Sequence, residues 1–167
     1  MSSDFGDDTA PRVLRAVAER AKLLFAGARD AALLFGVQIV ADSPESAFRQ
    51  AAATVLAACP KLEYIATTQR AVHSAEHHDL TGYFADRRER CVTAPMSLQP
   101  IVDRIGSGDA FAAGVLFGLC QNLGSQQTVE FALAAAALKH SLPGDFNTVS
   151  AQEVFALPQS SHRDVQR

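Results

Sequence analysis

Apolar residues recur at helical spacing in several segments of the chain. In the first segment, Val13, Val17 and Ala21 share one face, and arginine and glutamate residues occupy the other, as in an amphipathic helix. The same spacing predicts helices over residues 10–22, 28–35, 45–58, 110–122 and 129–139. The last two are alanine-rich and apolar on more than one side, so we expect them to pack on a sheet.

Capping residues mark the ends of two of these helices. Gly36 follows the second helix at the position where a left-handed C-terminal cap is usual. Asp42 or Ser43 can cap the third helix, with Pro44 in its first turn and Pro60 beyond its end. These signals fix the two helices more closely than apolar spacing alone.

Shorter apolar runs between the helices are expected to be strands. The run at residues 62–67 is typical of a buried strand, and polar segments at β spacing follow it. Strands are predicted over residues 23–26, 62–67, 81–86, 90–94 and 98–102, with an extended stretch at 37–41. Alternating strands and helices predict an α/β layered architecture with a largely parallel sheet. Residues 1–9 and 158–167 are expected to be flexible ends.

Composition narrows the class of protein without identifying it. The 167 residues are 48% hydrophobic and 20% charged, which suits one soluble domain with a substantial core. A net charge of −3 without a basic block argues against nucleic-acid or membrane partners, and no apolar run is long enough to cross a bilayer. Three widely spaced cysteines do not make a disulfide framework, so we expect a cytoplasmic protein.

One segment combines an apolar strand, a glycine-rich turn and the start of an apolar helix: residues 101–114, I-V-D-R-I-G-S-G-D-A-F-A-A-G. Gly106 and Gly108 allow consecutive backbone N–H groups to face one concavity, and the helix N-terminus adds its positive dipole end. This arrangement predicts an anion site, most simply for a phosphate. Asp109 would repel a resting phosphate but suits a base that takes a proton from an attacking hydroxyl. On the tetrapeptide alone, a tight turn with Asp109 as a helix cap is an open alternative.

Two longer sequence strings, found in this order along the chain, carry more information than the glycine turn alone. Residues 103–114 read D-R-I-G-S-G-D-A-F-A-A-G, and residues 135–147 read A-A-A-L-K-H-S-L-P-G-D-F-N. The first resembles the second signature of the ribokinase-like (PfkB) carbohydrate kinases, and the second resembles the 2-keto-3-deoxygluconate kinase branch of that family. The resemblance implies a three-layer αβα fold with a mostly parallel sheet, in which residues 10–157 form the nucleotide-binding and catalytic half and the N-terminal half is missing.

The resemblance also implies roles for individual residues. Asp109 would be the catalytic base, and Gly106, Ser107 and Gly108 would form the anion hole for the transferred phosphoryl group. ATP and Mg²⁺ would be the cofactors. The residues expected near the nucleotide are Thr68, Arg70, Arg104, Ala136, Lys139 and Asn147. The family's Asn-x-x-Glu metal motif aligns with residues 27–30, where its asparagine is absent and Asp30 replaces the glutamate. The implied reaction is phosphorylation of a sugar-acid hydroxyl by ATP.

Two further groups of polar residues have open interpretations. Arg70 suits either the ATP phosphates or the acid group of a sugar acid, and a plain surface arginine is an equal alternative. His73 and His77 have a spacing that binds metal on a helix, but they lie between strand-like runs. We therefore predict that residues 73–79 form a solvated connection.

The missing half leaves alternatives to a working kinase. The chain could be an inactive fragment that binds nucleotide or only oligomerises, because catalysis by positioning requires both reactants to be held closely. A phosphate- or nucleotide-sensing module is a third possibility. Loss of the opening strands would also leave a sheet edge and apolar helix faces uncovered, which predicts a homodimer.

Overall fold

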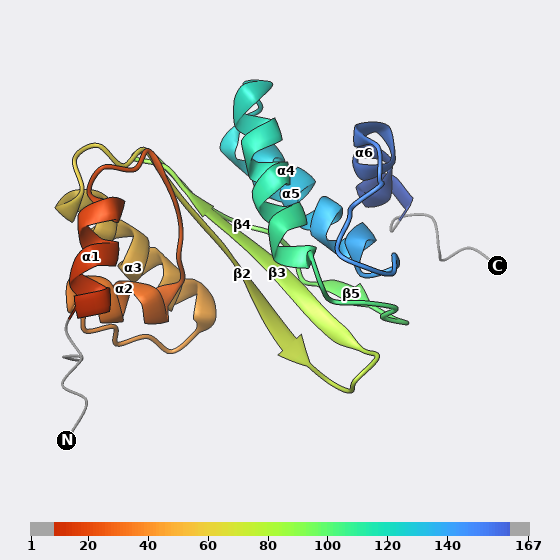
Figure 1. Cartoon of the computed structure of the whole chain (residues 1–167), viewed down its shortest axis with the longest axis horizontal. Coiled ribbons are helices and arrows are strands. Elements are labelled where there is room, and N and C mark those ends of the chain that lie inside the picture. The colour runs from red at the N-terminus through yellow and green to blue at the C-terminus, as the bar shows by residue number, and fades with distance from the viewer. Residues whose placement is uncertain (1–8, 161–167) are drawn as a thin grey trace, which may run out of the picture. The chain divides into compact units, whose positions relative to one another are not determined.

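The computed structural model describes residues 9–160 (Figure 1). The chain divides into two compact units, one of residues 1–67 and 85–90 and the other of residues 68–84 and 91–167. No helix in the described part of the chain is long and apolar enough to cross a membrane.

The first unit consists of short helices beside a parallel strand pair. Its elements are α1 (Thr9–Ala18), β1 (Leu23–Phe25), α2 (Ala28–Phe35), α3 (Pro44–Ala58) and the start of β2 (Tyr64–Val72). β1 pairs with β2 in parallel register, Leu23 opposite Tyr64. The Ser43 hydroxyl accepts a hydrogen bond from the Ser46 N–H at 3.2 Å and so begins α3. Phe48, Ala51, Ala52, Val55, Leu62 and Ile65 form the buried core of this unit.

The second unit places two long helices on an antiparallel part of the sheet. Its elements are the remainder of β2, then β3 (His78–Ala85), β4 (Arg90–Val92), β5 (Met96–Leu98), α4 (Ser107–Cys120), α5 (Ser125–Lys139) and α6 (Ala151–Ser160). The strand order is β1-β2-β3-β4, and β5 pairs antiparallel with β3. α5 lies against β3, since a Cβ at Gly82 would be 3.0 Å from Val129 Cγ2.

Glycine allows α4 and α5 to approach very closely. A Cβ at Gly114 would lie 2.6 Å from Ala132 Cα, and one at Gly118 would lie 2.8 Å from Thr128 Oγ1. Further along, the Phe117 and Phe131 rings stack with centroids 4.6 Å apart, and Phe155 of α6 packs against Phe131 at 4.7 Å. The alanine-rich composition of α5 is therefore a packing requirement, as its uniformly apolar pattern predicted.

The α/β prediction is confirmed, with differences at several elements. The sheet is mixed in the described residues, because the strands after β2 return as hairpins. The stretch at residues 37–41 is not a strand, the strand predicted at 98–102 lies at Met96–Leu98, and α4 begins at Ser107. α6 was not predicted; it takes in the start of the expected tail, whose remainder at residues 161–167 lies outside the described part.

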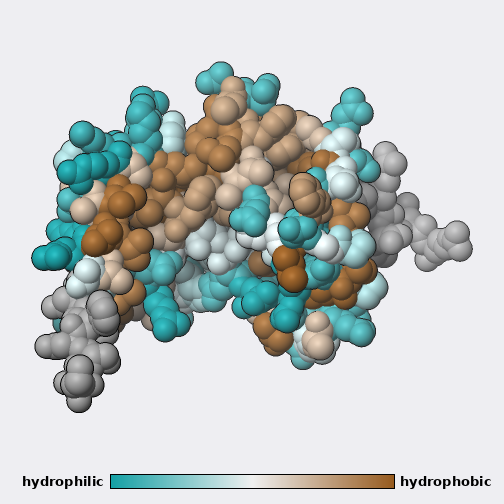
Figure 2. Space-filling model, in the orientation of Figure 1, coloured by the Kyte–Doolittle hydropathy of each residue, from teal (hydrophilic) through white to brown (hydrophobic). Residues whose placement is uncertain are grey.

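Apolar side chains reach the surface in each unit (Figure 2). On α1, Val13, Leu14 and Val17 are more than half exposed, and on α4 Leu116 is 51% exposed. Such surface is compatible with the expected homodimer, which stays a prediction.

Candidate functional site

The turn before α4 leaves backbone donors free. Gly106 is the N-cap in the left-handed region, with φ 78° and ψ −2°, and the first helical bond runs from the Ala110 N–H to the Gly106 carbonyl oxygen at 2.9 Å. Within the described residues, no acceptor takes a hydrogen bond from the N–H groups of Gly108 and Asp109. Free donors at a helix N-terminus, where the dipole is positive, are the groups that an anion would need, and the anion site itself stays a prediction.

Only glycine fits at position 106. A Cβ there would collide with the Asp145 carbonyl oxygen, and its left-handed backbone is strained for other residues. At Gly108, by contrast, a Cβ would meet nothing within 4 Å. The turn is therefore tightly packed at Gly106 and has open space beside Gly108.

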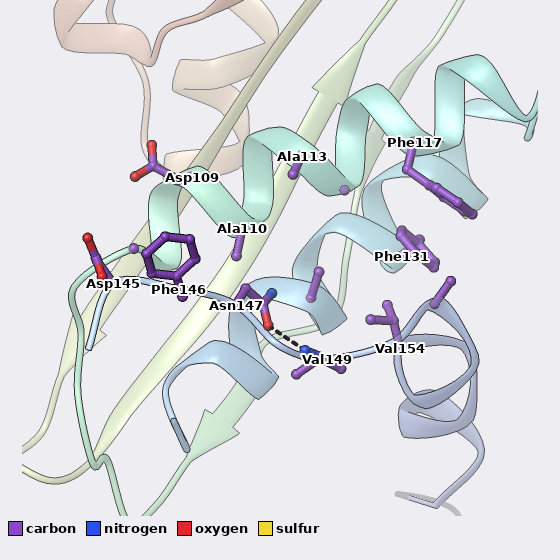
Figure 3. A pocket seen from close by; sticks show the side chains of 14 residues that line it. Asp109, Ala110, Ala113, Phe117, Phe131, Asp145, Phe146, Asn147, Val149 and Val154 are labelled. Carbon is purple, nitrogen blue, oxygen red and sulfur yellow. Dashed lines mark hydrogen bonds between the residues drawn. The ribbon is translucent and has the colours of Figure 1, made fainter. Parts of the chain in front are cut away.

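Asp109 projects from the first turn of α4 and is exposed (Figure 3). Its carboxylate makes no hydrogen bond within residues 9–160. Asp30 occupies the same third position of α2, but its Oδ2 accepts from the Gly27 N–H at 2.8 Å and caps that helix. The difference follows from the caps, because Gly27 is extended (φ −99°, ψ −173°) and Gly106 is left-handed. The helix-cap interpretation therefore suits Asp30, and Asp109 is free for a ligand.

Asp103 holds the turn in place, a role that sequence reasoning missed. Its Oδ1 accepts from the Ile105 N–H at 3.0 Å, and its Oδ2 accepts from the Gly144 N–H at 2.9 Å. The His140 carbonyl oxygen accepts from the N–H groups of Val102 and Asp103 as well. The hydrogen bonds from Ile105 and Gly144 lower the pKa of the Asp103 carboxyl. Asp103 thus ties the glycine turn to the loop that follows α5, and it is the first residue of the first motif string.

Lys139 lies beneath this turn. Its side chain is fully buried, and Nζ donates to the Leu142 carbonyl oxygen at 3.0 Å. Its Cε would be 3.3 Å from a Cβ at Gly106. In the described structure Lys139 supports the turn, and its expected contact with a nucleotide stays a prediction.

A cavity of about 430 Å³ opens beside the start of α4, and we call it the Arg70 cavity. Its lining is Thr68, Arg70, Val72, Leu80, Ser107, Gly108, Ala136 and His140. Thr68, Arg70 and Ala136, all expected near the nucleotide, therefore share one cavity with Ser107 and Gly108 of the expected anion hole. Arg104, also expected there, is exposed and not part of this lining.

His140 is a member of the Arg70 cavity that sequence reasoning did not select. Its Nδ1 donates to the Ala136 carbonyl oxygen at 2.7 Å, and its Nε2 is buried without a partner among the described residues. Burial lowers the pKa of His140, and the nearby charge of Arg70 lowers it further. The hydrogen bond to the Ala136 carbonyl acts in the opposite direction but is a smaller effect than burial. His140 therefore presents a neutral ring to the cavity.

A second cavity, of about 420 Å³, also borders the start of α4, and we call it the Asn147 cavity (Figure 3). Asp109, Asp145 and Asn147 are its polar lining, and Ala110, Ala113, Phe117, Phe131, Val149 and Val154 are apolar members. Asn147 Oδ1 accepts from the Val149 N–H at 3.1 Å, so its side chain is oriented by the loop backbone. Gly106 and Asp109 thus border a largely apolar cavity.

Comparisons with known proteins show the family of this chain. The family model of the pfkB carbohydrate kinases matches residues 1–151. The 2-dehydro-3-deoxygluconokinase of Bacillus subtilis (strain 168) is 35% identical over 65 residues, which are 39% of this chain and 20% of that protein.

Solved structures give longer matches. The crystal structure of a PfkB family carbohydrate kinase from Listeria grayi is 31% identical with a TM-score of 0.82, covering 90% of this chain and 45% of that one. The 2-dehydro-3-deoxygluconokinase from Thermotoga maritima is 28% identical with a TM-score of 0.80, covering 88% of this chain and 44% of that one. The chain thus spans less than half the length of these relatives. It belongs to the pfkB family of carbohydrate kinases.

Proposed function

We propose that this chain carries the phosphoryl-transfer centre of a sugar kinase, with ATP as donor and a 2-keto-3-deoxy sugar acid as acceptor. The observation that carries the proposal is the free carboxylate of Asp109 beside the unpaired amides at the start of α4. The similarity to 2-dehydro-3-deoxygluconokinases supports the choice of acceptor.

The amides of Gly108 and Asp109 stabilise the negative charge that develops on the transferred phosphoryl group. They are preorganised, because Gly106 and Asp103 hold the turn before any ligand arrives. Fixed donors of this kind lower a barrier without reorganising during the reaction. The Arg70 guanidinium lines the same cavity as Gly108, where it can contact either a phosphate or the carboxylate of a sugar acid.

Asp109 accepts the proton of the sugar hydroxyl as that oxygen attacks the phosphorus. Its carboxylate is an acceptor without a competing intramolecular donor among the described residues. A general base must lie within hydrogen-bond distance of the hydroxyl whose proton it accepts. Catalysis of this kind increases the rate roughly 10²–10⁴-fold. The anion hole and base lie on one helix turn, so the attacking and transferred groups meet there.

The Asn147 cavity and the free amides suit the base and the phosphates of ATP, respectively. The Asn147 cavity has a volume within the usual range for small-molecule sites, about 300–1,000 Å³, and its apolar side chains suit a flat base. Mg²⁺ would neutralise charge on the phosphates when bound. Asp30 as its ligand stays a prediction, and one of its oxygens already caps α2.

The test compares Asp109→Asn with Asp42→Asn, a matched carboxylate-to-amide change in the exposed segment before α3. We expect ADP release that depends on 2-keto-3-deoxygluconate in the unaltered chain and in Asp42→Asn. Asp109→Asn should lose at least 100-fold in turnover and keep ATP binding by calorimetry. Unchanged turnover in Asp109→Asn would remove Asp109 from its role.

A second candidate is nucleotide binding without transfer. The Asn147 cavity favours it, because its largely apolar lining suits a flat nucleobase, whereas transfer also requires the acceptor to be held closely. ATP-dependent thermal stabilisation without ADP release would support this candidate. Absence of both would reject both.

A further inference from the structure

Two histidines and an aspartate meet at the turn between β2 and β3. His73 Nε2 lies 2.7 Å from Asp79 Oδ2, and His77 Nε2 lies 3.9 Å from Asp79 Oδ1. The imidazole rings are 4.6 Å apart, and the donor atoms of the three side chains all lie within 4.8 Å of one another. None of the three lines the Arg70 or Asn147 cavity. The expectation of a merely solvated connection did not foresee this convergence.

The hairpin itself brings these side chains together. The N–H groups of His73 and Ser74 both donate to the His77 carbonyl oxygen at 3.0 Å, which closes the turn. His77 and Asp79 are two residues apart, so their side chains leave the same face of the strand. His78 between them points to the other face and is fully buried. The cluster is therefore fixed by strand geometry and not by the helical spacing of His73 and His77.

The donor set is that of a transition-metal site. Two imidazoles and one carboxylate are three of the four ligands that Zn²⁺ commonly takes, leaving a position for water. Ligand atoms about 2.0–2.2 Å from a tetrahedral Zn²⁺ are separated by roughly 3.3 Å, a value between the 2.7 Å and 3.9 Å separations seen here. The two separations run to different oxygens of Asp79, and all donor atoms lie within 4.8 Å of one another, so side-chain rotations would bring one oxygen and both rings onto a single ion.

An ordinary surface ion pair explains the cluster less well. One histidine would be enough to pair with Asp79, yet two imidazole rings, tilted 37° to each other, lie beside its carboxylate. Ser97 of β5, directly opposite Asp79, also lies 2.9 Å from His77 Nε2. On metal binding, the hydrogen bond between the Ser97 hydroxyl and His77 Nε2 would be replaced by the bond from Nε2 to the metal. All three side chains remain partly exposed, so an ion can reach them.

We propose that His73, His77 and Asp79 bind one divalent transition-metal ion, with Zn²⁺ as the best match, separately from the Mg²⁺ expected with ATP. The bound ion joins the end of β2 to β3. Because it binds the folded hairpin, it stabilises the fold as its concentration rises above the dissociation constant.

The test titrates the full chain with ZnCl₂ by calorimetry, without nucleotide or Mg²⁺. We expect one ion per chain and a higher melting temperature with Zn²⁺. His73→Ala and Asp79→Asn should each weaken binding at least tenfold and remove the thermal shift. Glu76→Gln is the matched control, because Glu76 is an exposed carboxylate of the same turn outside the cluster.

Co²⁺ provides an independent signal, since its visible absorption reports ligand geometry. The unaltered chain and Glu76→Gln should show the spectrum of a nitrogen- and oxygen-ligated ion, and His77→Ala should lose it. Zn²⁺ binding of equal strength in the three cluster variants would overturn the proposal. So would the absence of binding to a chain whose circular dichroism shows it to be folded.

Discussion

Replacing Gly106 or Gly108 with alanine should separate the stability of the α4 turn from its ligand binding. At Gly106 the left-handed backbone costs an alanine about 1–2 kcal/mol. The added Cβ also meets the Asp145 backbone carbonyl, which cannot rotate away as a side chain could. Together these effects should lower the free energy of unfolding by roughly 2–4 kcal/mol, and the melting temperature by roughly 4–16 °C.

At Gly108 the opposite result is expected for stability. A Cβ there meets no atom within 4 Å, and the residue lies in the first turn of α4 without a positive φ. Alanine should therefore raise the free energy of unfolding by about 0.5–1 kcal/mol, because it lowers the conformational entropy of the unfolded chain. Its methyl group would, however, occupy the open space in front of the free amides, so ATP binding should weaken.

The assay is thermal unfolding with and without ATP, with Gly36→Ala as the control. Gly36 is also left-handed (φ 65°), but a Cβ there has no neighbour within 4 Å. The difference between Gly106→Ala and Gly36→Ala isolates the collision with Asp145. Equal losses in these two variants would refute the close approach. Full ATP stabilisation in Gly108→Ala would refute the anion site.

Two further predictions concern the core and pH. Gly114→Ala should lower the free energy of unfolding by about 1–3 kcal/mol in urea, because its Cβ would press on the Ala132 backbone of α5; unchanged stability would contradict that contact. Burial lowers the pKa of His140, and the groups facing it are the cations Arg70, Lys139 and Arg104 and the imidazole of His78, whose own pKa is also lowered by burial. Below pH 6.5, the ordinary pKa of histidine, His140 takes up a proton in the unfolded chain, whereas in the folded chain it stays neutral to lower pH. The melting temperature should therefore fall as pH drops below 6.5, and less so in His140→Gln.

Capping signals predicted two helices of the first unit well, whereas α1, predicted over residues 10–22 without such a signal, ends already at Ala18. α2 has the expected bounds, and Gly36 is its left-handed cap. Ser43 and Pro44 begin α3 as expected, because capping depends on residues next to the helix. A comparable signal marked the missed α6: the Ser150 hydroxyl accepts from the Glu153 N–H, and Glu153 Oε2 accepts from the Ser150 N–H. This capping box could have been recognised from the sequence.

Strands were predicted less well because partners define them. β2 continues from the apolar run at residues 62–67 to Val72, through residues that are half-buried or exposed. No apolar pattern marks this extension, which exists because β3 returns beside it. The cluster of His73, His77 and Asp79 has the same origin, since the hairpin turn pairs the His73 backbone with that of His77 and so brings the His73 side chain to Asp79. Long-range pairing of this kind leaves little trace in a single sequence.

The Arg70 cavity shows where motif reasoning succeeded and where it stopped. The glycine turn was selected from the first motif string, and Thr68, Arg70 and Ala136 were expected near the nucleotide from the family resemblance; they all line one cavity. His140 was not selected, although it belongs to the second string. Its place in the cavity depends on where α5 ends, at Lys139, and on which way the next ring turns. The motifs and the resemblance therefore identified the segments, and backbone geometry determines which of their side chains line the cavity.

The two G-x-x-D segments show why sequence cannot separate a helix cap from a catalytic base. Residues 27–30 and 106–109 share the spacing, and in each the aspartate is the third residue of a helix. An extended cap directs its N–H toward that carboxylate, whereas a left-handed cap directs it elsewhere. Asp103 binds the backbone of Ile105, next to Gly106, and of Gly144, and the Asp145 carbonyl leaves no room for a Cβ at Gly106. Residues outside the motif therefore release Asp109 from capping, and its availability as a base depends on their contacts.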